Sequence, residues 1–295
     1  MLKKYVLDLE VKSVQQLNER YVLLRLTYSA PLPAMLPGQF VELQIDHEPN
    51  TFLRRPISIN FVDRDANELW LLVACVGNGT KRLARLQPDD TLNAMLPLGN
   101  GFTVPHNVGS ASSNAASTSS NAGSVLANAG SAGKRFLLDG GGVGVAPLLY
   151  LGKVLKDCGS DVTYLLGART RGDLLMLDEF EQYGRVLVTT EDGSQGEKGF
   201  VTNHSVLEQE RFDMIQCCGP TPMMKAVARY AKAKGIDCEV SLENLMACGL
   251  GACLCCVEKV ASASNASEGG EAVATNVCVC KDGPVFNIKR LLWQL

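Results

Sequence analysis

Short apolar runs separated by turn residues fill the first hundred residues of the chain. Residues 22–26, 39–43 and 69–73 are rich in Val, Leu and Phe, and residues 1–10 alternate apolar and polar positions as a strand does. Proline and glycine separate these runs, for instance at Pro37-Gly38. Several short strands with regular turns are typical of a small antiparallel barrel. We therefore expect an antiparallel β-barrel over residues 1–104.

From residue 134 onward, strand-like apolar runs alternate with helical patterns. Leu148, Leu151 and Leu155 recur at helical spacing after Pro147, a residue suited to the first turn of a helix. Gly235 is well placed to end a second helix that begins at about residue 222. Strands are expected at 135–139, 162–167, 185–190 and 214–218. This alternation predicts an α/β domain with a parallel sheet over residues 134–238.

Two stretches differ in composition from the rest of the chain. Residues 107–133 and 261–272 consist largely of Ser, Asn, Ala and Gly. Such segments bury too little apolar surface to offset the entropy lost on ordering them. We therefore predict low-complexity insertions at 105–133 and 261–276. The chain is then multi-domain, with a barrel, an α/β parallel-sheet domain and a small C-terminal module over residues 239–295.

Size, charge and hydropathy limit the classes of function. A length of 295 residues suits about two domains. The net charge of −3, without any basic run, points to neither nucleic acid nor an anionic membrane as a partner. No run of apolar residues is long enough for a transmembrane helix, and acidic residues appear too early at the N-terminus for a signal peptide. We expect a cytoplasmic protein without membrane or nucleic-acid contacts.

The cysteines are concentrated near the C-terminus. Nine of the 11 lie after residue 216, and six of these fall between residues 248 and 280. An odd number of cysteines in a cytoplasmic chain argues against a disulfide framework. Cys248, Cys253 and Cys256 stand at C-x4-C-x2-C spacing, with Cys280 following, which is the spacing of plant-type [2Fe–2S] sites. A zinc site is the alternative, but zinc sites favour paired C-x2-C units.

Two motifs in the barrel region suggest a flavin. Arg55-Pro56-Ile57-Ser58 offers a guanidinium fork for a pyrophosphate and a hydroxyl for a flavin ring or ribityl chain. A solvated edge strand is the alternative reading. The glycines of residues 76–80 leave backbone N–H groups free for a phosphate. A simple hairpin turn at Asn78-Gly79 is equally compatible with the sequence, and both readings can hold together.

Two motifs in the α/β region suggest a dinucleotide. The glycines Gly140, Gly141, Gly142 and Gly144 follow a predicted strand and precede a predicted helix, so that phosphate can approach the bare backbone at a helix N-terminus. A tight strand-to-helix turn is the alternative, because the glycines do not match G-x-G-x-x-G in register. Cys218-Gly219-Pro220 lies at a strand end, where a nicotinamide would be met. A buried structural cysteine is the alternative there.

The order of these motifs resembles the ferredoxin-NADP reductase superfamily. The tail, with Glu243, residues 246–256 and residues 280–286, resembles the electron-transfer subunits of two-subunit dihydroorotate dehydrogenases. The resemblance implies an FAD barrel, a nicotinamide domain and a [2Fe–2S] module. It implies FAD contacts from Arg55, Pro56, Ile57, Ser58, Leu72, Val73, Ala74, Gly79 and Thr80, and cluster ligands Cys248, Cys253, Cys256 and Cys280. Cys255 and Cys278 depart from the family pattern and leave Cys255 versus Cys256, and Cys278 versus Cys280, open in principle; we favour Cys256 and Cys280.

Substrate chemistry is expected on another chain. The three histidines, His47, His106 and His204, are scattered, and we expect them at the surface rather than in an acid–base site. A flavin connects two-electron nicotinamide chemistry with one-electron iron–sulfur chemistry. The resemblance implies electrons from the FMN of a dihydroorotate-oxidising subunit through [2Fe–2S] and FAD to NAD+, in pyrimidine biosynthesis, within a heterotetramer of two plus two subunits. The alternatives are a reductase subunit of a hydrogenase, sulfide dehydrogenase or transhydrogenase complex, and a non-redox zinc protein.

Overall fold

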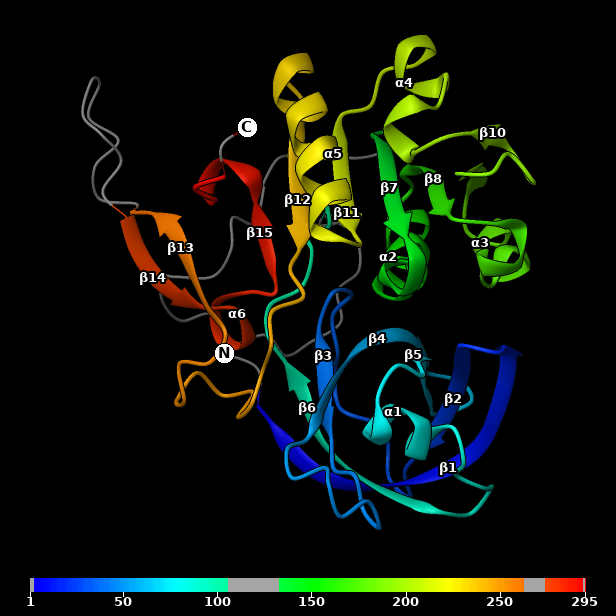
Figure 1. Cartoon of the computed structure of the whole chain (residues 1–295), viewed down its shortest axis with the longest axis vertical. Helices are drawn as coiled ribbons and strands as arrows, with labels where there is room; N and C mark the ends of the chain where they lie inside the picture. The colour runs from blue at the N-terminus through cyan, green and yellow to red at the C-terminus, as the bar shows by residue number, and fades with distance from the viewer. Residues whose placement is uncertain (1–2, 106–132, 263–273, 294) are drawn as a thin grey trace.

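The computed structural model describes residues 3–105, 133–262, 274–293 and 295. Figure 1 shows a barrel, a helix-covered sheet and a small hairpin beside them, so that the predicted multi-domain architecture is confirmed. The insertion predicted at 105–133 lies outside the described residues except at its ends. Most of the insertion predicted at 261–276 also lies outside them, although residues 274–276 belong to a strand.

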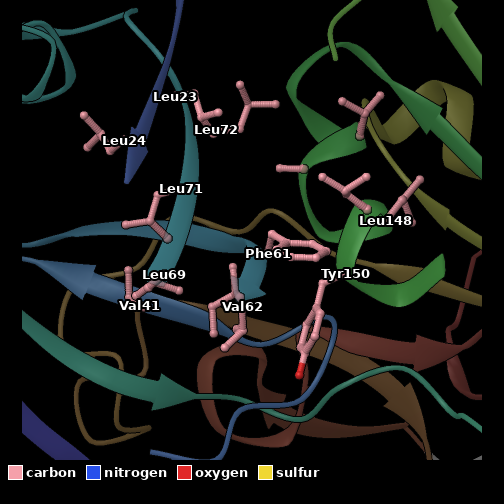
Figure 2. Packing of buried hydrophobic residues seen from close by; sticks show 14 of the residues in the cluster. Leu23, Leu24, Val41, Phe61, Val62, Leu69, Leu71, Leu72, Leu148 and Tyr150 are labelled. Carbon is pink, nitrogen blue, oxygen red and sulfur yellow. The ribbon is translucent and has the colours of Figure 1, made fainter. Parts of the chain in front are cut away.

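Six antiparallel strands close the barrel in the order β1-β2-β5-β4-β3-β6. The strands are β1 (Tyr5–Asn18), β2 (Tyr21–Thr27), β3 (Phe40–Leu43), β4 (Arg55–Asp63), β5 (Glu68–Ala74) and β6 (Thr91–Leu98). A short helix, α1 (Asn78–Leu83), connects β5 to β6. The barrel wall is buried on both faces in places, since Leu23 and Leu24 are each fully buried on one strand. Its second face packs against the α/β domain, where the Phe61 ring lies 5.9 Å from the ring of Tyr150 (Figure 2).

Seven strands form the sheet of the α/β domain in the order β10-β9-β8-β7-β11-β12-β15. They are β7 (Arg135–Gly141), β8 (Asp161–Ala168), β9 (Arg185–Thr190), β10 (Glu197–Lys198), β11 (Met214–Cys218), β12 (Asp237–Ser241) and β15 (Val285–Asn287). All neighbours are parallel except β15, which pairs antiparallel with β12. The boundary expected at residue 238 falls inside β12, and the C-terminal module supplies the last strand.

Helices cover both faces of this sheet. The elements are η1 (Gly142–Val145), α2 (Ala146–Asp157), η2 (Arg171–Asp173), α3 (Leu177–Glu181), η3 (Val201–Asn203), α4 (Val206–Gln209) and α5 (Thr221–Lys234). Leu148, Leu151 and Leu155 of α2 are fully buried, as their spacing predicts. Helix α5 ends at Gly235 with φ of 69°, a left-handed conformation that glycine adopts without steric cost.

The C-terminal module is a two-stranded antiparallel hairpin followed by a short helix. Strands β13 (Val257–Ala261) and β14 (Ala274–Cys278) pair from Val257 opposite Cys278 to Ala261 opposite Ala274. Helix α6 (Val279–Asp282), strand β15 and the turn η4 (Ile288–Arg290) complete the chain. The hairpin was not predicted from the sequence.

A buried polar network fixes the barrel against the sheet. Glu239 of β12 accepts hydrogen bonds from the backbone N–H of Thr103 at 2.9 Å and from its hydroxyl at 2.5 Å. Gln216 of β11 donates to the carbonyl oxygen of Thr103 at 2.8 Å and to Glu239 at 3.0 Å. Because Thr103 lies in the segment that leaves the last barrel strand, β6, these bonds hold this segment on the parallel sheet.

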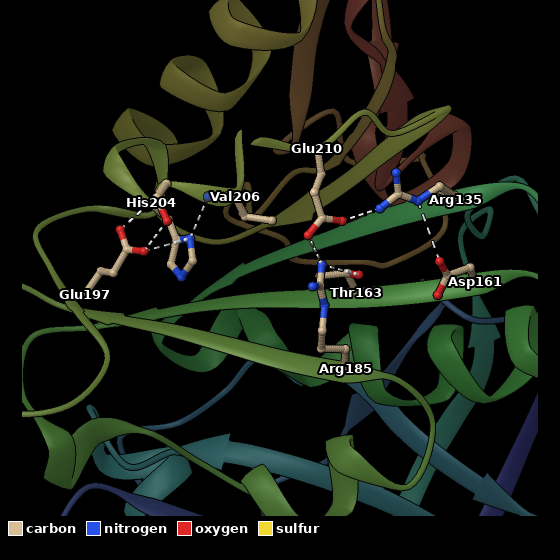
Figure 3. A network of polar contacts seen from close by, with 9 residues as sticks. Arg135, Asp161, Thr163, Arg185, Glu197, His204, Val206 and Glu210 are labelled. Carbon is tan, nitrogen blue, oxygen red and sulfur yellow. Dashed lines mark hydrogen bonds and ion pairs between the residues drawn. The ribbon is translucent and has the colours of Figure 1, made fainter. Parts of the chain in front are cut away.

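A second network lies where the parallel strands β7 and β9 begin (Figure 3). Arg135 and Arg185, the first residues of β7 and β9, both donate to Glu210, and Arg135 is also 3.6 Å from Asp161. His204 is buried rather than at the surface, so the expectation for this residue was wrong. Its Nδ1 accepts a hydrogen bond from the backbone N–H of Val206 at 3.0 Å, which gives it a structural role.

Over the described ranges, no helix combines the length and apolar character needed to cross a membrane.

Candidate functional site

The two glycine-containing motifs of the α/β domain meet at one edge of the sheet. Gly140 on β7 lies opposite Cys218 on β11, so the turns that follow these strands are neighbours. A Cβ atom at Gly144 would stand 2.5 Å from Cα of Gly219, which is closer than two carbons can approach. Gly144 is therefore required for the contact between the turns, and both turns lie where ligands bind in open parallel sheets.

Cys218 is buried at this edge beside an acidic residue that follows β12. Burial and the charge of Glu243 raise the pKa of the Cys218 thiol well above its ordinary value, while Ser241 lowers it. The Glu243 side chain is exposed at its surface, but the surrounding protein removes part of its hydration, which raises the pKa of Glu243 as well. In the sequence, Glu243 stood out only as part of the tail motif. The pairing of β12 with β11 in the structure is what brings it next to Cys218.

The barrel wall opens between β4 and β5. These strands pair from Ile59 opposite Leu71 to Asp63 opposite Glu68, whereas Arg55 to Ser58 pair only with β3. Leu72, Val73 and Ala74 of β5 pair only with β2. The two strands therefore diverge at the residues expected to contact FAD, and each leaves one edge of its main chain without a strand partner. The pairing of the two strands is irregular between Ile59 and Phe61.

Residues 77–83 form a helical turn beside this opening, so the alternative of a hairpin turn at Asn78-Gly79 was wrong. The Thr80 hydroxyl oxygen accepts a hydrogen bond from the backbone N–H of Gly77 at 3.1 Å and closes the turn. A Cβ atom at Gly79 would stand 3.1 Å from Nε of Arg55. The structure thus brings Arg55 beside Gly79 and Thr80, which follow it by more than 20 residues in the sequence.

The segment between β12 and β13, which we call the cysteine loop, contains a thiol that ionises readily and can therefore bind a metal. Burial opposes ionisation of Cys248, but hydrogen bonds from the backbone N–H groups of Leu250, Cys253 and Ala252 and from the Cys253 thiol lower the pKa of Cys248 to about 6. The Leu250 nitrogen is 3.3 Å from the Cys248 sulfur. Because metals bind the thiolate form, this donor set fits an iron–sulfur cluster.

The remaining cysteines of the tail differ in exposure. Cys256 and Cys280 are buried, and the backbone N–H of Cys280 donates to the Cys256 sulfur at 3.4 Å. Cys253 and Cys255 are exposed, and Cys278 is buried. In the part of the chain that the structure describes, no three His, Cys, Asp or Glu side chains converge on the position of a single metal ion. A [2Fe–2S] cluster does not need such a point, because its four thiolates are shared between two irons.

The cysteine loop packs directly against the barrel. A Cβ atom at Gly249 would stand 2.9 Å from Cγ of Glu42 and 3.1 Å from Cδ1 of Leu98, on strands β3 and β6. The turn that follows α6 also contacts the segment after β6, where the backbone N–H of Asn100 donates to the carbonyl of Gly283 at 2.6 Å. Figure 1 shows the loop between β12 and β13 beside the barrel. The residue that follows Cys248 is therefore held against the barrel wall.

Glu42 separates the cysteine loop from the strand that carries Arg55 to Ser58. It is fully buried, and among the described residues neither carboxylate oxygen has a hydrogen-bond partner. Burial raises the pKa of Glu42 to about 7, although Arg54 opposes the rise. Glu42 pairs with Pro56 on one side and with Met95 on the other. Strand β3 is thus the shared wall between the expected flavin and cluster sites, a position that no motif in the sequence indicated.

Comparisons with family models identify two parts of the chain. Residues 138–229 match the oxidoreductase NAD-binding domain. Residues 243–292 match the iron–sulfur cluster binding domain of dihydroorotate dehydrogenase B. These ranges contain the glycine turns and the cysteine loop described above.

Solved structures share the fold. A chain of the NADH-dependent reduced ferredoxin-NADP oxidoreductase is 28% identical, with a TM-score of 0.75, and the match covers 96% of this chain and 89% of that one. The ferredoxin NADP+ reductase of Neisseria gonorrhoeae, solved with FAD and NADP, is 16% identical with a TM-score of 0.57, over 78% of this chain and 92% of that one.

Curated relatives match most of the chain. The dihydroorotate dehydrogenase B (NAD(+)) electron transfer subunit of Caldanaerobacter subterraneus is 38% identical over 259 residues, which are 87% of each chain. The subunit of the same name from Shouchella clausii is 36% identical over 253 residues, which are 85% of each chain. The chain described here therefore belongs to the family of electron transfer subunits of dihydroorotate dehydrogenase B (NAD(+)).

Proposed function

We propose that this chain passes electrons from the FMN of a dihydroorotate-oxidising partner, by way of a [2Fe–2S] cluster and FAD, to NAD+ in pyrimidine biosynthesis. Iron–sulfur clusters carry single electrons, nicotinamides exchange hydride, and a flavin converts between the two. The observation that carries the proposal is the contact of Gly249 with Glu42 and Leu98. The loop that contains Cys248 and Cys253 lies one strand away from Arg55 to Ser58, and this short separation supports the proposed route.

The chain's own residues would hold each group. Arg55, Gly79 and Thr80 lie together beside the opening between β4 and β5, where the guanidinium suits a pyrophosphate. The free main-chain edges of residues 55–58 and 72–74 suit the hydrogen-bonding rim of a flavin. Cys248, Cys253, Cys256 and Cys280 would bind the cluster, and Gly140 to Gly144 with Cys218, Gly219 and Pro220 would receive NAD+.

Replacing Gly144 by alanine tests the nucleotide site. The added Cβ would overlap backbone atoms of Gly219, so the two turns must separate, at a cost of roughly 1–3 kcal/mol. We expect NADH affinity to fall about tenfold or more, because the turns that approach the nucleotide move apart. The measurement is NADH titration of the FAD-loaded protein by fluorescence. FAD content should stay unchanged, and an unaltered NADH affinity would contradict the assignment of this turn.

Three leucines of the cysteine loop are exposed and suit contact with a partner subunit. Leu245, Leu250 and Leu254 are 85%, 45% and 63% exposed, respectively. Apolar side chains of this kind gather at protein interfaces. Leu250 and Leu254 lie on either side of Cys253 in the sequence, and Cys253 is itself exposed, so a subunit covering them would reach the proposed cluster ligands directly.

Leu254→Asp tests this docking surface. Leu254 has φ of 58°, a conformation that aspartate tolerates better than leucine does, so the change should not strain the backbone. A carboxylate buried at an apolar interface should weaken binding of the catalytic subunit about tenfold or more. The measurement is the Kd between separately purified subunits. Phe200→Asp is the matched control, since Phe200 is 62% exposed near β10, at the other edge of the sheet from β15. Equal effects of the two changes would argue against docking at the leucines.

A reductase subunit of a transhydrogenase-type complex is the second candidate. It is favoured by the likeness to the NADH-dependent reduced ferredoxin-NADP oxidoreductase over 96% of this chain. Isolation of the native complex from cytoplasmic extract, followed by a dihydroorotate-to-NAD+ assay, separates the two. We expect an FMN-containing partner, two copies of each subunit by native mass spectrometry, and turnover of dihydroorotate. A complex that lacks this turnover would exclude the leading proposal.

A further inference from the structure

The thiols around the cysteine loop outnumber the four ligands of a [2Fe–2S] cluster. Besides Cys248, Cys253, Cys256 and Cys280, the sulfur of Cys278 faces the same loop and lies 3.7 Å from the carbonyl oxygen of Gly251. Cys278 is only 8% exposed. Cys278 pairs with Val257 across the hairpin, and the backbone N–H of Val279 donates to the Cys256 carbonyl oxygen at 3.0 Å, so Cys278 lies beside an expected ligand.

Cys280 has the same neighbours. The backbone N–H of Cys280 donates to the Cys256 sulfur at 3.4 Å, and the backbone N–H of Gly251 donates to the Cys280 sulfur. Cys278 and Cys280 thus both contact Gly251 and both lie beside Cys256. Cys255, by contrast, is exposed to solvent. The protein holds two thiols where a cluster with three other ligands needs one.

The backbone carries both thiols on one short segment. Cys278 ends β14 and is the residue before the first turn of α6, and its N–H donates to the Asp282 carboxylate at 2.8 Å. Cys280 lies within α6. In this one backbone conformation the Cys278 sulfur meets the carbonyl oxygen of Gly251 and the Cys280 sulfur meets its N–H, so exchange between them needs no change in the path of the chain.

We propose that Cys278 is a reserve ligand of the cluster, which binds the iron of Cys280 whenever the bond between Cys280 and iron is lost. In this exchange the iron–sulfur bond to Cys280 breaks, the bond to Cys278 forms, and the Cys278 proton moves to the Cys280 thiolate. No electron is transferred. The inference rests on the proposed function, since it requires a [2Fe–2S] cluster in this loop.

Serine variants of the full chain, purified anaerobically with its partner, test the exchange. For Cys280→Ser we expect most of the iron and sulfide to be retained, with the visible and EPR spectra of an all-thiolate cluster, because Cys278 replaces the lost sulfur. Cys278→Ser should match the wild type. The double variant Cys278→Ser/Cys280→Ser should lose about fivefold or more of its iron, or show the shifted spectra of oxygen ligation. Cys255→Ser is the matched control and should keep the wild-type cluster.

The possible outcomes are distinct. If Cys280→Ser and the double variant have the same iron content and spectra, Cys278 does not reach the iron and the proposal is wrong. If Cys278→Ser alone loses the cluster, Cys278 is the primary ligand and the reserve role is also excluded. A wild-type protein without iron and sulfide would instead contradict the proposed function. FAD content, measured for every variant, shows that the barrel remains folded.

Discussion

Replacing Cys248 by alanine is expected to reduce dihydroorotate-dependent reduction of NAD+ about a hundredfold or more. Backbone N–H groups of Leu250, Cys253 and Ala252 surround the Cys248 sulfur, and the pKa of Cys248 lies at about 6. This thiol is therefore largely ionised at neutral pH and ready to bind iron. The measurement is steady-state turnover of the purified complex, together with its iron content and visible spectrum.

Reduction of ferricyanide by NADH should survive the same change, because this dye accepts electrons from the flavin without the cluster. Cys158→Ala is the control for loss of a thiol, since Cys158 follows helix α2 and its sulfur donates to the carbonyl of Pro105. Persistence of dihydroorotate-to-NAD+ turnover in Cys248→Ala would contradict the proposed route. Loss of both activities would show instead that the cysteine loop supports the fold of the barrel that it contacts.

Replacing Asp139 by asparagine is expected to raise the stability of the protein, by an amount that increases with pH. Asp139 is buried on β7, its Oδ1 atom has no hydrogen-bond partner among the described residues, and burial raises its pKa from 3.8 to about 8. Between these two values the folded state keeps a proton that the unfolded state has released. The free energy of unfolding of the wild type therefore falls as pH rises, by roughly 1.4 kcal/mol per pH unit from this group.

Asparagine has nearly the same shape and does not titrate, so the variant should lack this contribution. The difference in Tm between variant and wild type should grow from pH 5 to pH 8 and reach about 5–10 °C. The measurement is thermal unfolding of the FAD-loaded protein at several pH values. Asp65→Asn, in the exposed turn between β4 and β5, is the control and should give parallel curves. A Tm difference that is constant with pH would show that Asp139 is ionised in the folded protein.

The candidate site was predictable from the sequence to the extent that its motifs are local. The spacing of Cys248, Cys253 and Cys256 indicated the cluster, and the glycines at 140–144 indicated a nucleotide turn, because each motif acts through residues a few positions apart. The hairpin of β13 and β14 was missed, since a low-complexity stretch interrupts its pattern. The buried position of His204 was also missed, because it depends on contacts with the backbone of a neighbouring turn.

The sequence by itself determined the β and α/β character of the two larger parts of the chain, and the cysteines and glycines proposed to carry the chemistry. These follow from hydrophobic periodicity and from the backbone freedom of glycine, which are local properties. Only the tertiary structure decided that β4 and β5 diverge at residues 55–58 and 72–74, and that β3 lies between this opening and the cysteine loop. Barrel closure and packing between distant segments set these positions, and neither is encoded in the spacing of residues along the chain.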